Sequence, residues 1–192
     1  AFTLDGVDLN ITPDINLTLT GAVAVVTGGE AYTAVKMQDI TVTASTVSGD
    51  FGLEGTFTFN SIDYNGAADS FDRLDWTTLN LNPGAELPTP QDLTIDFTRD
   101  FVHRITGSVT GDAGNSNIFI TSGDVTLAGT AEFAVTRYQQ NIGTLTEANV
   151  DSFAFTLDGV DLNITPDINL TLTGAVAVVT GGEAYTAVKM QD

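Results

Sequence analysis

Apolar and polar residues alternate with a period of two through most of this chain. Between residues 15 and 25, for example, every second position is aliphatic or glycine, and threonine, asparagine and alanine fill most positions between. Such alternation is typical of strands with one buried and one exposed face, whereas amphipathic helices repeat about every 3.6 residues. No window shows convincing helical periodicity, so the sequence predicts an all-β protein.

The predicted strands follow one another closely. They are expected at 7–11, 15–25, 31–37, 40–44, 51–64, 74–81, 93–97, 101–109, 118–120 and 125–135, with turns or loops at 13–14, 27–30, 48–50, 65–68 and 111–117. The strand 51–64 changes phase after Phe59, which predicts a β-bulge. Residues 82–91 hold three of the five prolines and predict an exposed irregular loop. Residues 139–151 lack a clear pattern, and their portion 145–150 could form a helical turn.

An exact repeat is the second pattern. Residues 1–39 return letter for letter as residues 154–192, a period of 153 residues. Copies within one globular domain diverge because each meets a different environment, so this identity needs a special explanation. Three remain open: a window of a tandem array, a subunit that donates a terminal strand to its neighbour, or an engineered duplication. The start at Ala1 and the end at Asp192, inside a strand pattern, favour the window.

An older duplication divides the period. Residues 48–64 align with residues 122–138, with eight matches in 17 positions and an offset of 74. The period is therefore predicted to contain two homologous halves. Residues 1–47 would complete a half-unit begun in the preceding repeat, 48–121 would form half-unit A with the loop 82–91, and 122–192 would form half-unit B.

Both halves contain a motif of an aliphatic residue, any residue, glycine, and then alanine, serine or threonine. Its glycines are Gly21, Gly55, Gly107 and Gly129, each in phase with the aliphatic face. Glycine weakens a strand unless backbone or a bulky group must come close. Two interpretations stay open: a large side chain from a facing sheet covers each glycine, or each glycine marks a bulge that bends a long strand.

Composition narrows the possible partners. The formal net charge is −19, of which −15 falls on residues 1–153. This charge argues against nucleic acid or an anionic membrane as a partner. The hydrophobic content of 42% suits a packed core, and the chain has no cysteine, so stability is expected from packing and hydrogen bonds rather than disulfides. No apolar run approaches the roughly 20 residues that span a bilayer.

Candidate catalytic residues are sparse. His103 is the only histidine, and its phase with apolar neighbours predicts a partly buried strand residue. Catalytic triads and zinc sites therefore lack their usual residues, and no carboxylate pair stands out for glycoside hydrolysis. We expect a protein that is not an enzyme and has no cofactor.

Two features resemble binding sites. Oxygen ligands that suit calcium cluster at Asp112, Asn115 and Asn117 in the turn 111–117 and at Asp5 and Asp8. These residues also favour turns, and turn formation is the preferred interpretation. Threonines on the polar strand faces, such as Thr18, Thr20, Thr41 and Thr43, could bind ice or polysaccharide, although threonine is also common on strands.

Repeated acidic, cysteine-free β units rich in threonine, valine, aspartate and glycine resemble the extender regions of giant bacterial surface adhesins and related extracellular fibres. The resemblance covers the whole chain but is architectural, since no family motif matches and no site residue is implied. It implies β-sandwich spacers, often stiffened by calcium, that hold an end domain away from the cell.

We therefore expect an antiparallel β-sandwich or β-roll repeat that stacks end to end into a filament at the cell surface, with adjacent copies of itself as partners. The expected function is mechanical, in a filament, stalk or adhesin spacer. Two alternatives are a multivalent module that binds carbohydrate, mineral or ice, and a fibre subunit that polymerises by strand donation.

Overall fold

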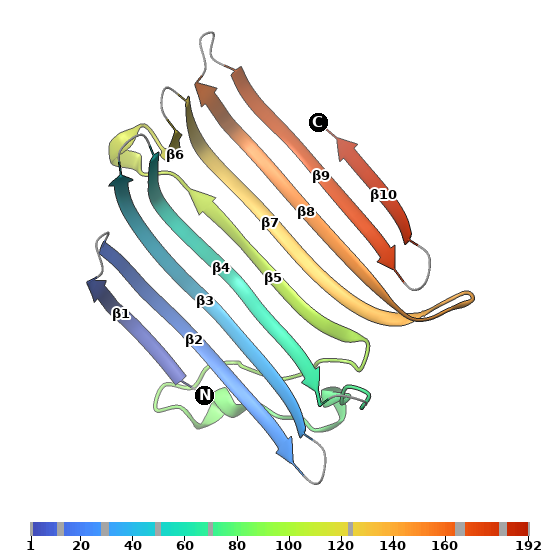
Figure 1. Cartoon of the computed structure of the whole chain (residues 1–192). Coiled ribbons are helices and arrows are strands. Elements are labelled where there is room, and N and C mark those ends of the chain that lie inside the picture. Colours follow the sequence, from blue (N-terminus) through green and yellow to red (C-terminus); the bar gives the residue numbers. More distant parts are fainter. Residues whose placement is uncertain are drawn as a thin grey trace.

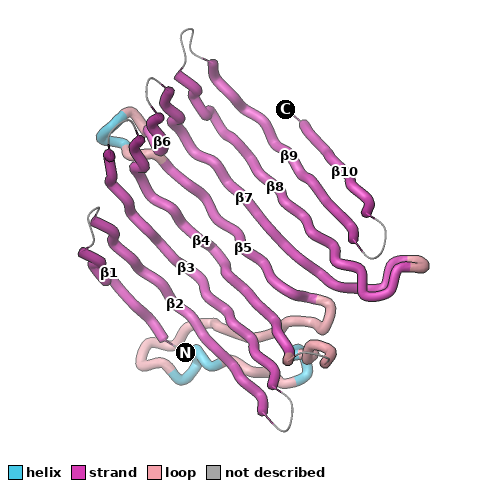
Figure 2. Tube along the Cα trace, viewed as in Figure 1, coloured by secondary structure: helices cyan, strands magenta, loops and turns pink. Residues whose placement is uncertain are grey.

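The computed structural model contains one large antiparallel sheet (Figures 1 and 2). It describes residues 2–10, 14–27, 31–48, 51–68, 71–122, 125–163, 168–180 and 184–191. The strands are β1 (Phe2–Asn10), β2 (Asp14–Thr27), β3 (Ala31–Ser48), β4 (Phe51–Ala67), β5 (Phe101–Thr110), β6 (Ile118–Ser122), β7 (Val125–Ile142), β8 (Leu145–Asn163), β9 (Ile168–Thr180) and β10 (Ala184–Gln191). Their order is β1-β2-β3-β4-β5-β7-β8-β9-β10, and β6 pairs with β4 and β7. The all-β prediction is confirmed.

The described strands form a single layer. No second sheet faces the first within the described ranges, so the expected β-sandwich or β-roll is not confirmed. The sheet also runs through residues 48 and 122, where β3 and β6 end, and the division into half-units there stays a prediction. The turns expected at 13–14, 27–30 and 48–50 fall largely on residues outside the described ranges.

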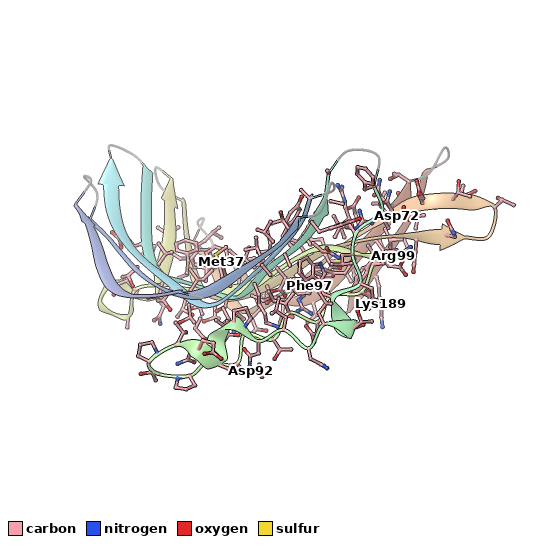
Figure 3. The ribbon with its side chains drawn as sticks, turned by 90° about the horizontal axis from the view of Figure 1, so that it is seen from below. Met37, Asp72, Asp92, Phe97, Arg99 and Lys189 are labelled. Carbon is pink, nitrogen blue, oxygen red and sulfur yellow. The ribbon has the colours of Figure 1, made fainter. Side chains whose placement is uncertain are left out.

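The sheet is arched in profile (Figure 3). Register shifts interrupt the pairing within the strands, between Leu4 and Val7, Thr18 and Thr20, Phe59 and Ser61, Ala128 and Thr130, and Leu157 and Val160. Extra residues of this kind bend a strand and increase its twist, which accounts for the arch. The shift after Phe59 confirms the bulge that the change of phase predicted.

Residues 71–100, here called the strap, leave the sheet between β4 and β5 and cross its convex face (Figure 3). The strap contains two short 3-10 turns, η1 (Trp76–Thr78) and η2 (Pro83–Glu86). Its two legs are bonded to each other, since Trp76 N donates to Phe97 O at 2.8 Å and Ile95 N donates to Leu81 O at 2.8 Å. The strands predicted at 74–81 and 93–97 are wrong, because only the isolated bridge between Leu81 and Ile95 has strand pairing.

The core lies between the strap and the sheet. Ala24 and Ala34 pair directly on β2 and β3, and their small side chains let the strap approach closely. Trp76 and Ile95 of the strap are 0% and 1% exposed above them. The apolar residues of the strap therefore alternate because the strap packs against a face of the sheet, and not because it is a strand of the sheet.

β7 and β8 form a long hairpin that turns at Gly143 and Thr144. The helical turn considered for residues 145–150 is wrong, because β8 begins at Leu145. Asn141 Oδ1 accepts a hydrogen bond from Glu147 N at 2.9 Å, and Glu147 has a φ of 50°. This side-chain bond across the hairpin stabilises the irregular backbone that hid the strand pattern.

The two copies of the repeated segment have the same strand pairing. The matching residues form β1, β2 and the start of β3 in one copy and the end of β8, β9 and β10 in the other. Phe2 pairs with Gly21 in the first copy, and Phe155 pairs with Gly174 in the second. The register shift after Leu4 also recurs after Leu157. The identical sequences thus share the same internal pairing register, and the array hypothesis stays a prediction.

Candidate interaction surface

Trp76 anchors the strap to the sheet. Its indole Nε1 donates to Asn65 Oδ1 on β4 at 2.9 Å, and both side chains are fully buried. Asn65 Nδ2 donates in turn to Leu74 O at 3.2 Å and to Thr98 O at 3.0 Å. One amide therefore ties both legs of the strap to β4. Sequence reasoning missed this role and placed Asn65 in a loop; the only available signal was the single tryptophan.

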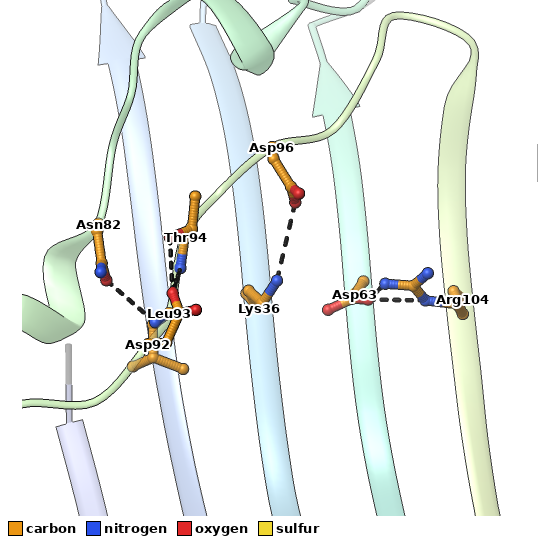
Figure 4. Close-up of polar contacts among 8 residues, drawn as sticks. All are labelled: Lys36, Asp63, Asn82, Asp92, Leu93, Thr94, Asp96 and Arg104. Atoms are coloured by element: carbon orange, nitrogen blue, oxygen red, sulfur yellow. Dashed lines mark hydrogen bonds and ion pairs between the residues drawn. The ribbon is translucent and has the colours of Figure 1, made fainter.

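Figure 4 shows two pairs of oppositely charged residues. Arg104 on β5 donates to Asp63 Oδ2 on β4, through Nη2 at 2.6 Å and Nε at 3.0 Å. Lys36 on β3 places its Nζ 3.8 Å from Asp96 Oδ1 of the strap and 6.0 Å from the ring centroid of Phe97. The contact with Asp96 and Phe97 joins the sheet to the strap through charge as well as packing.

Side-chain hydrogen bonds also fix the segment of the strap that contains Leu93 and Ile95 (Figure 4). Asn82 Oδ1 accepts a hydrogen bond from Leu93 N at 3.0 Å. Thr94 donates to Asp92 Oδ1 from its hydroxyl at 2.6 Å and from its backbone N at 3.2 Å, and these bonds lower the pKa of Asp92. These bonds within the strap stabilise the conformation of the segment that contains Leu93 and Ile95.

A polar pocket of about 500 Å³ lies where the strap meets the β7–β8 hairpin. Arg73 donates to Gln139 Oε1 at 2.7 Å and to Arg99 O at 3.1 Å, and Arg99 Nη1 lies 3.4 Å from Asp72 Oδ2. Burial lowers the pKa of Arg73, although Asp100 raises it. These contacts fasten the end of the strap to the β7–β8 hairpin.

The predicted calcium residues lie in separate places. Asp112 Oδ1 accepts from Gly114 N at 3.1 Å and caps the 3-10 turn η3 (Ala113–Asn115), which is the role of a turn former. Asp5 and Asp8 lie on β1, with β2, β3 and β4 between that strand and β5. Among the described residues, no group of three or more His, Asp or Glu could hold a metal ion. The side chains of Asp5, Asp8 and Asn115 lie outside the described residues, and Asn117 has a φ of 58°.

The motif glycines divide into two kinds. Gly55 and Gly129 have φ values of 108° and 118°, which fits the bulge interpretation and requires glycine. At Gly107, an added Cβ would lie 3.0 Å from Phe133 Cζ, so the Phe133 ring covers this glycine. The covering ring comes from the neighbouring strand, where Phe133 pairs with Gly107, and not from a facing sheet as expected. Gly21 is buried and pairs with Phe2.

His103 lies on the opposite face from the strap, in direct register with Tyr64 and Arg137. Its side chain is partly buried, as the sequence predicted. Burial lowers the pKa of His103, Arg137 lowers it further, and Asp151 opposes both. Arg137 is held by Asp151 through two hydrogen bonds of 2.5 and 3.0 Å, which raise the pKa of Arg137.

Threonine rows cross the face that carries the strap. Direct pairing joins Thr41, Thr58, Ser108, Glu132 and Thr156 in one row and Thr43, Thr56, Thr110 and Thr130 in another. The first row is interrupted by Glu132. Neighbouring hydroxyls in a row lie at the strand spacing of about 4.8 Å, so the predicted rows through Thr41 and Thr43 are present. Thr20, expected on the same exposed face, is buried and pairs with Gln38.

No protein-family model matches this chain, and no curated protein or solved structure matches it either. Among the described residues, no helix has the length and apolar character that crossing a membrane requires. The sheet, the strap and the exact repeat are therefore the features that bear on function.

Proposed function

We propose that this chain is a structural repeat of an extracellular filament, stalk or adhesin spacer in which successive copies continue one antiparallel sheet. The observation that carries the proposal is the continuity of the sheet through the repeated sequence. β8 runs from Leu145 to Asn163, and its residues from Ala154 onward repeat the sequence of the edge strand β1. A following copy would therefore continue the same sheet instead of meeting this one through a linker.

The two edges of the sheet match each other. β1 is an edge strand, and its counterpart in β8 pairs with β7. β10 is the other edge strand, and its counterpart β3 pairs with β4. Exposed edges are available for pairing with another chain. In the proposed array, β1 would pair with the β7 of the preceding copy, and β10 would pair with the β4 of the following copy.

The geometry of one period is regular. The order from β1 to β8 takes six strand-to-strand steps, so one period would lengthen the sheet by about 29 Å at about 4.8 Å per step.

Direct pairing leads across the sheet from Lys36 to Ala187, through Asp63, Arg104, Thr136, Ser152 and Ala177. The counterpart of Lys36 is Lys189, two residues further along. Each copy would thus be displaced by about 7 Å along the strands.

We also propose two homologous halves in each period. Gly55 and Gly129 are 74 residues apart and share a positive φ. Gly107 and Gly174 occupy the matching motif of the two halves, and each lies under a phenylalanine of a neighbouring strand. Phe133 of β7 follows Gly107 in the sheet order, and Phe155 of β8 precedes Gly174. The halves differ because half-unit A carries the strap where half-unit B continues directly into β8.

The chemistry of the surface supports an extracellular location. The net charge of −19 would keep a long polymer soluble and would repel nucleic acid. The absence of cysteine leaves packing, the Trp76 anchor and backbone pairing as the stabilising interactions. Adjacent copies of the same sequence are the proposed partners, and no catalytic step is proposed.

The experiment compares chains of one, two and three periods, each closed by a copy of residues 1–39. Small-angle scattering should show a maximum dimension that grows by about 29 Å per period. An increment that varies with length, or separate units on flexible linkers, would contradict the proposal. The mass of the native polymer under denaturing conditions distinguishes the covalent array from strand donation, since donation requires short chains.

The threonine rows favour a second candidate, a multivalent module that binds carbohydrate, mineral or ice. Repetition of such rows along an array would give avidity. The test is binding to polysaccharide and ice by the chain and by the variants Thr58→Val and Thr156→Val. A loss of binding in these variants, but not in a control with Thr77→Val on the strap, would support this candidate.

A further inference from the structure

The sheet face beneath the strap occurs twice in this chain. In the first copy, Ala24 and Ala34 belong to the buried cluster with Trp76 and Ile95 of the strap, and Tyr32 packs against that cluster. The counterparts 153 residues later are Ala177, Ala187 and Tyr185. Ala177 pairs directly with Ala187, just as Ala24 pairs with Ala34.

The second copy of this face is exposed. Lys189 and Ala187 are exposed, and the side chain of Tyr185 is 53% exposed, whereas Ala34 is 0% exposed. Directly paired residues of an antiparallel sheet share a face, and pairing connects Lys36 to Ala187 across the sheet. Lys189 and Tyr185, two positions either side of Ala187, therefore lie on the strap face. Figure 3 shows Lys189 on the side of the sheet that carries the strap.

The exposed face includes a hollow. A pocket of about 420 Å³ is lined by Val179 and Tyr185 together with the tip of the β7–β8 hairpin. In the first copy, the counterpart of Tyr185 is Tyr32, which packs against the cluster that the strap completes. The second copy thus has the same apolar surface, but no segment among the described residues covers it.

We propose that the face of β9 and β10 is the docking site for the strap of a second copy of this chain, the copy that follows in the array. The occupant is specified by the chain itself, because an identical stretch of sequence is covered by residues 71–100 in the first copy. This inference rests on the proposed function, and it names the segment through which one repeat completes the core of its neighbour.

Charge complementarity supports the same occupant. The strap carries Asp96, and Asp96 lies 3.8 Å from Lys36, the counterpart of Lys189. In the first copy the Lys36 side chain is 18% exposed in this contact. The strap of the following copy would bring its own Asp96 to Lys189 and would place its Trp76 and Ile95 over Ala177 and Ala187.

The chain offers a clean measurement because Lys36 and Lys189 are its only lysines. The test protein is this chain extended beyond Asp192 by a second copy of residues 40–110, which continues the period and adds no lysine. Acylation of the two lysines by an amine-reactive ester is followed by peptide mass spectrometry. In the original chain Lys189 should react faster than Lys36, and in the extended chain both should react at the same slow rate, within about twofold.

Backbone hydrogen exchange of Ala184–Gln191 separates this inference from the proposed function. Pairing of β10 with the added copy of β4 should protect these amides, whatever the strap does. Protected amides with a fast Lys189 would overturn strap docking alone. Unprotected amides with a fast Lys189 would overturn both the continuous sheet and the docking.

A matched control changes only the strap of the added copy. Trp76→Ala in that copy should restore fast acylation of Lys189 while the amides of β10 stay protected. Asp96→Asn in that copy leaves the apolar packing intact and should raise the Lys189 rate by less than Trp76→Ala does. A Lys189 that stays slow in both variants would show that another segment covers this face and would overturn the inference.

Discussion

Trp76 Nε1 donates a hydrogen bond to Asn65 Oδ1, 2.9 Å away, where both side chains are fully buried. The two residues are only eleven positions apart, yet they lie on different elements of the fold, Trp76 on the strap and Asn65 on β4. Because Asn65 also bonds to Leu74 O and Thr98 O, it holds the strap at its start and at its end.

Asn65→Ala should lower the free energy of unfolding by about 2–3 kcal/mol. The change leaves the Trp76 indole N–H and Leu74 O without the partner that Asn65 provides, and each unsatisfied buried group costs about 1–3 kcal/mol. Thr98 O keeps the hydrogen bond from Phe101 N at 3.2 Å. Urea unfolding followed by the emission of the single tryptophan measures the loss. Leu79→Ala is the control, because Leu79 is 46% exposed and surface changes stay within about 0.5 kcal/mol. Equal losses in the two variants would contradict the anchor.

Arg104→Met should destabilise the protein by about 3 kcal/mol. Asp63 is 1% exposed, and the removal of one partner leaves a buried carboxylate uncompensated. The side chain of Arg104 is 41% exposed, so solvent keeps the loss near the lower end of the range for buried pairs. Arg99→Met breaks the exposed pair with Asp72 and should cost less than about 1 kcal/mol. A double-mutant cycle with Asp63→Asn measures the coupling.

Gly55→Ala should cost about 2–3 kcal/mol, and Gly143→Ala should cost about 1 kcal/mol. Both glycines have positive φ values, 108° and 60°, and strained backbone costs about 1–3 kcal/mol. An added Cβ at Gly55 would also clash with Thr110 O, whereas nothing lies within 4 Å at Gly143. Thermal unfolding of the two variants checks the order. A Gly143 variant that is the less stable of the two would contradict the steric argument.

The stability of the protein should fall as the pH drops below about 6.5, in part because of His103. Burial lowers the pKa of His103 from its ordinary value of 6.5, so the unfolded state binds a proton first. Stability therefore rises with pH across this window and is lost as the pH falls through the unfolded pKa. Carboxylates contribute at lower pH, so the comparison between the native chain and His103→Gln isolates the histidine. Equal slopes between pH 7 and about pH 5.5 would contradict the argument.

Local patterns in the sequence predicted the strands well. The alternation around Phe57 and Phe59 predicted β4, and the change of phase after Phe59 predicted the register shift observed there. These features depend on a residue and its near neighbours along the chain. The exact repeat in the sequence is matched by an equal pairing in the structure, where Gly21 pairs with Phe2 and Gly174 pairs with Phe155.

The strap could not be predicted from periodicity. Every second side chain of this part of the strap, at Leu93, Ile95 and Phe97, packs on the apolar face of the sheet. A half-buried strand has the same spacing of apolar residues. The partners of Trp76 and Lys36, which are Asn65 and Asp96, depend on how the strap folds back across β2 and β3. A single sequence contains no local signal for that path.

The pairing of successive strands in one continuous sheet would determine how the proposed array responds to tension. The strands would lie across the direction in which copies succeed one another, so a pull on the two ends would act along the hydrogen bonds between strands. Such bonds break a strand at a time, beginning at an edge. A period that spans about 29 Å when folded contains about 500 Å of extended chain. A filament of this design would lengthen in steps at low force and absorb sudden loads, in the manner of a shock absorber and not of a stiff rod.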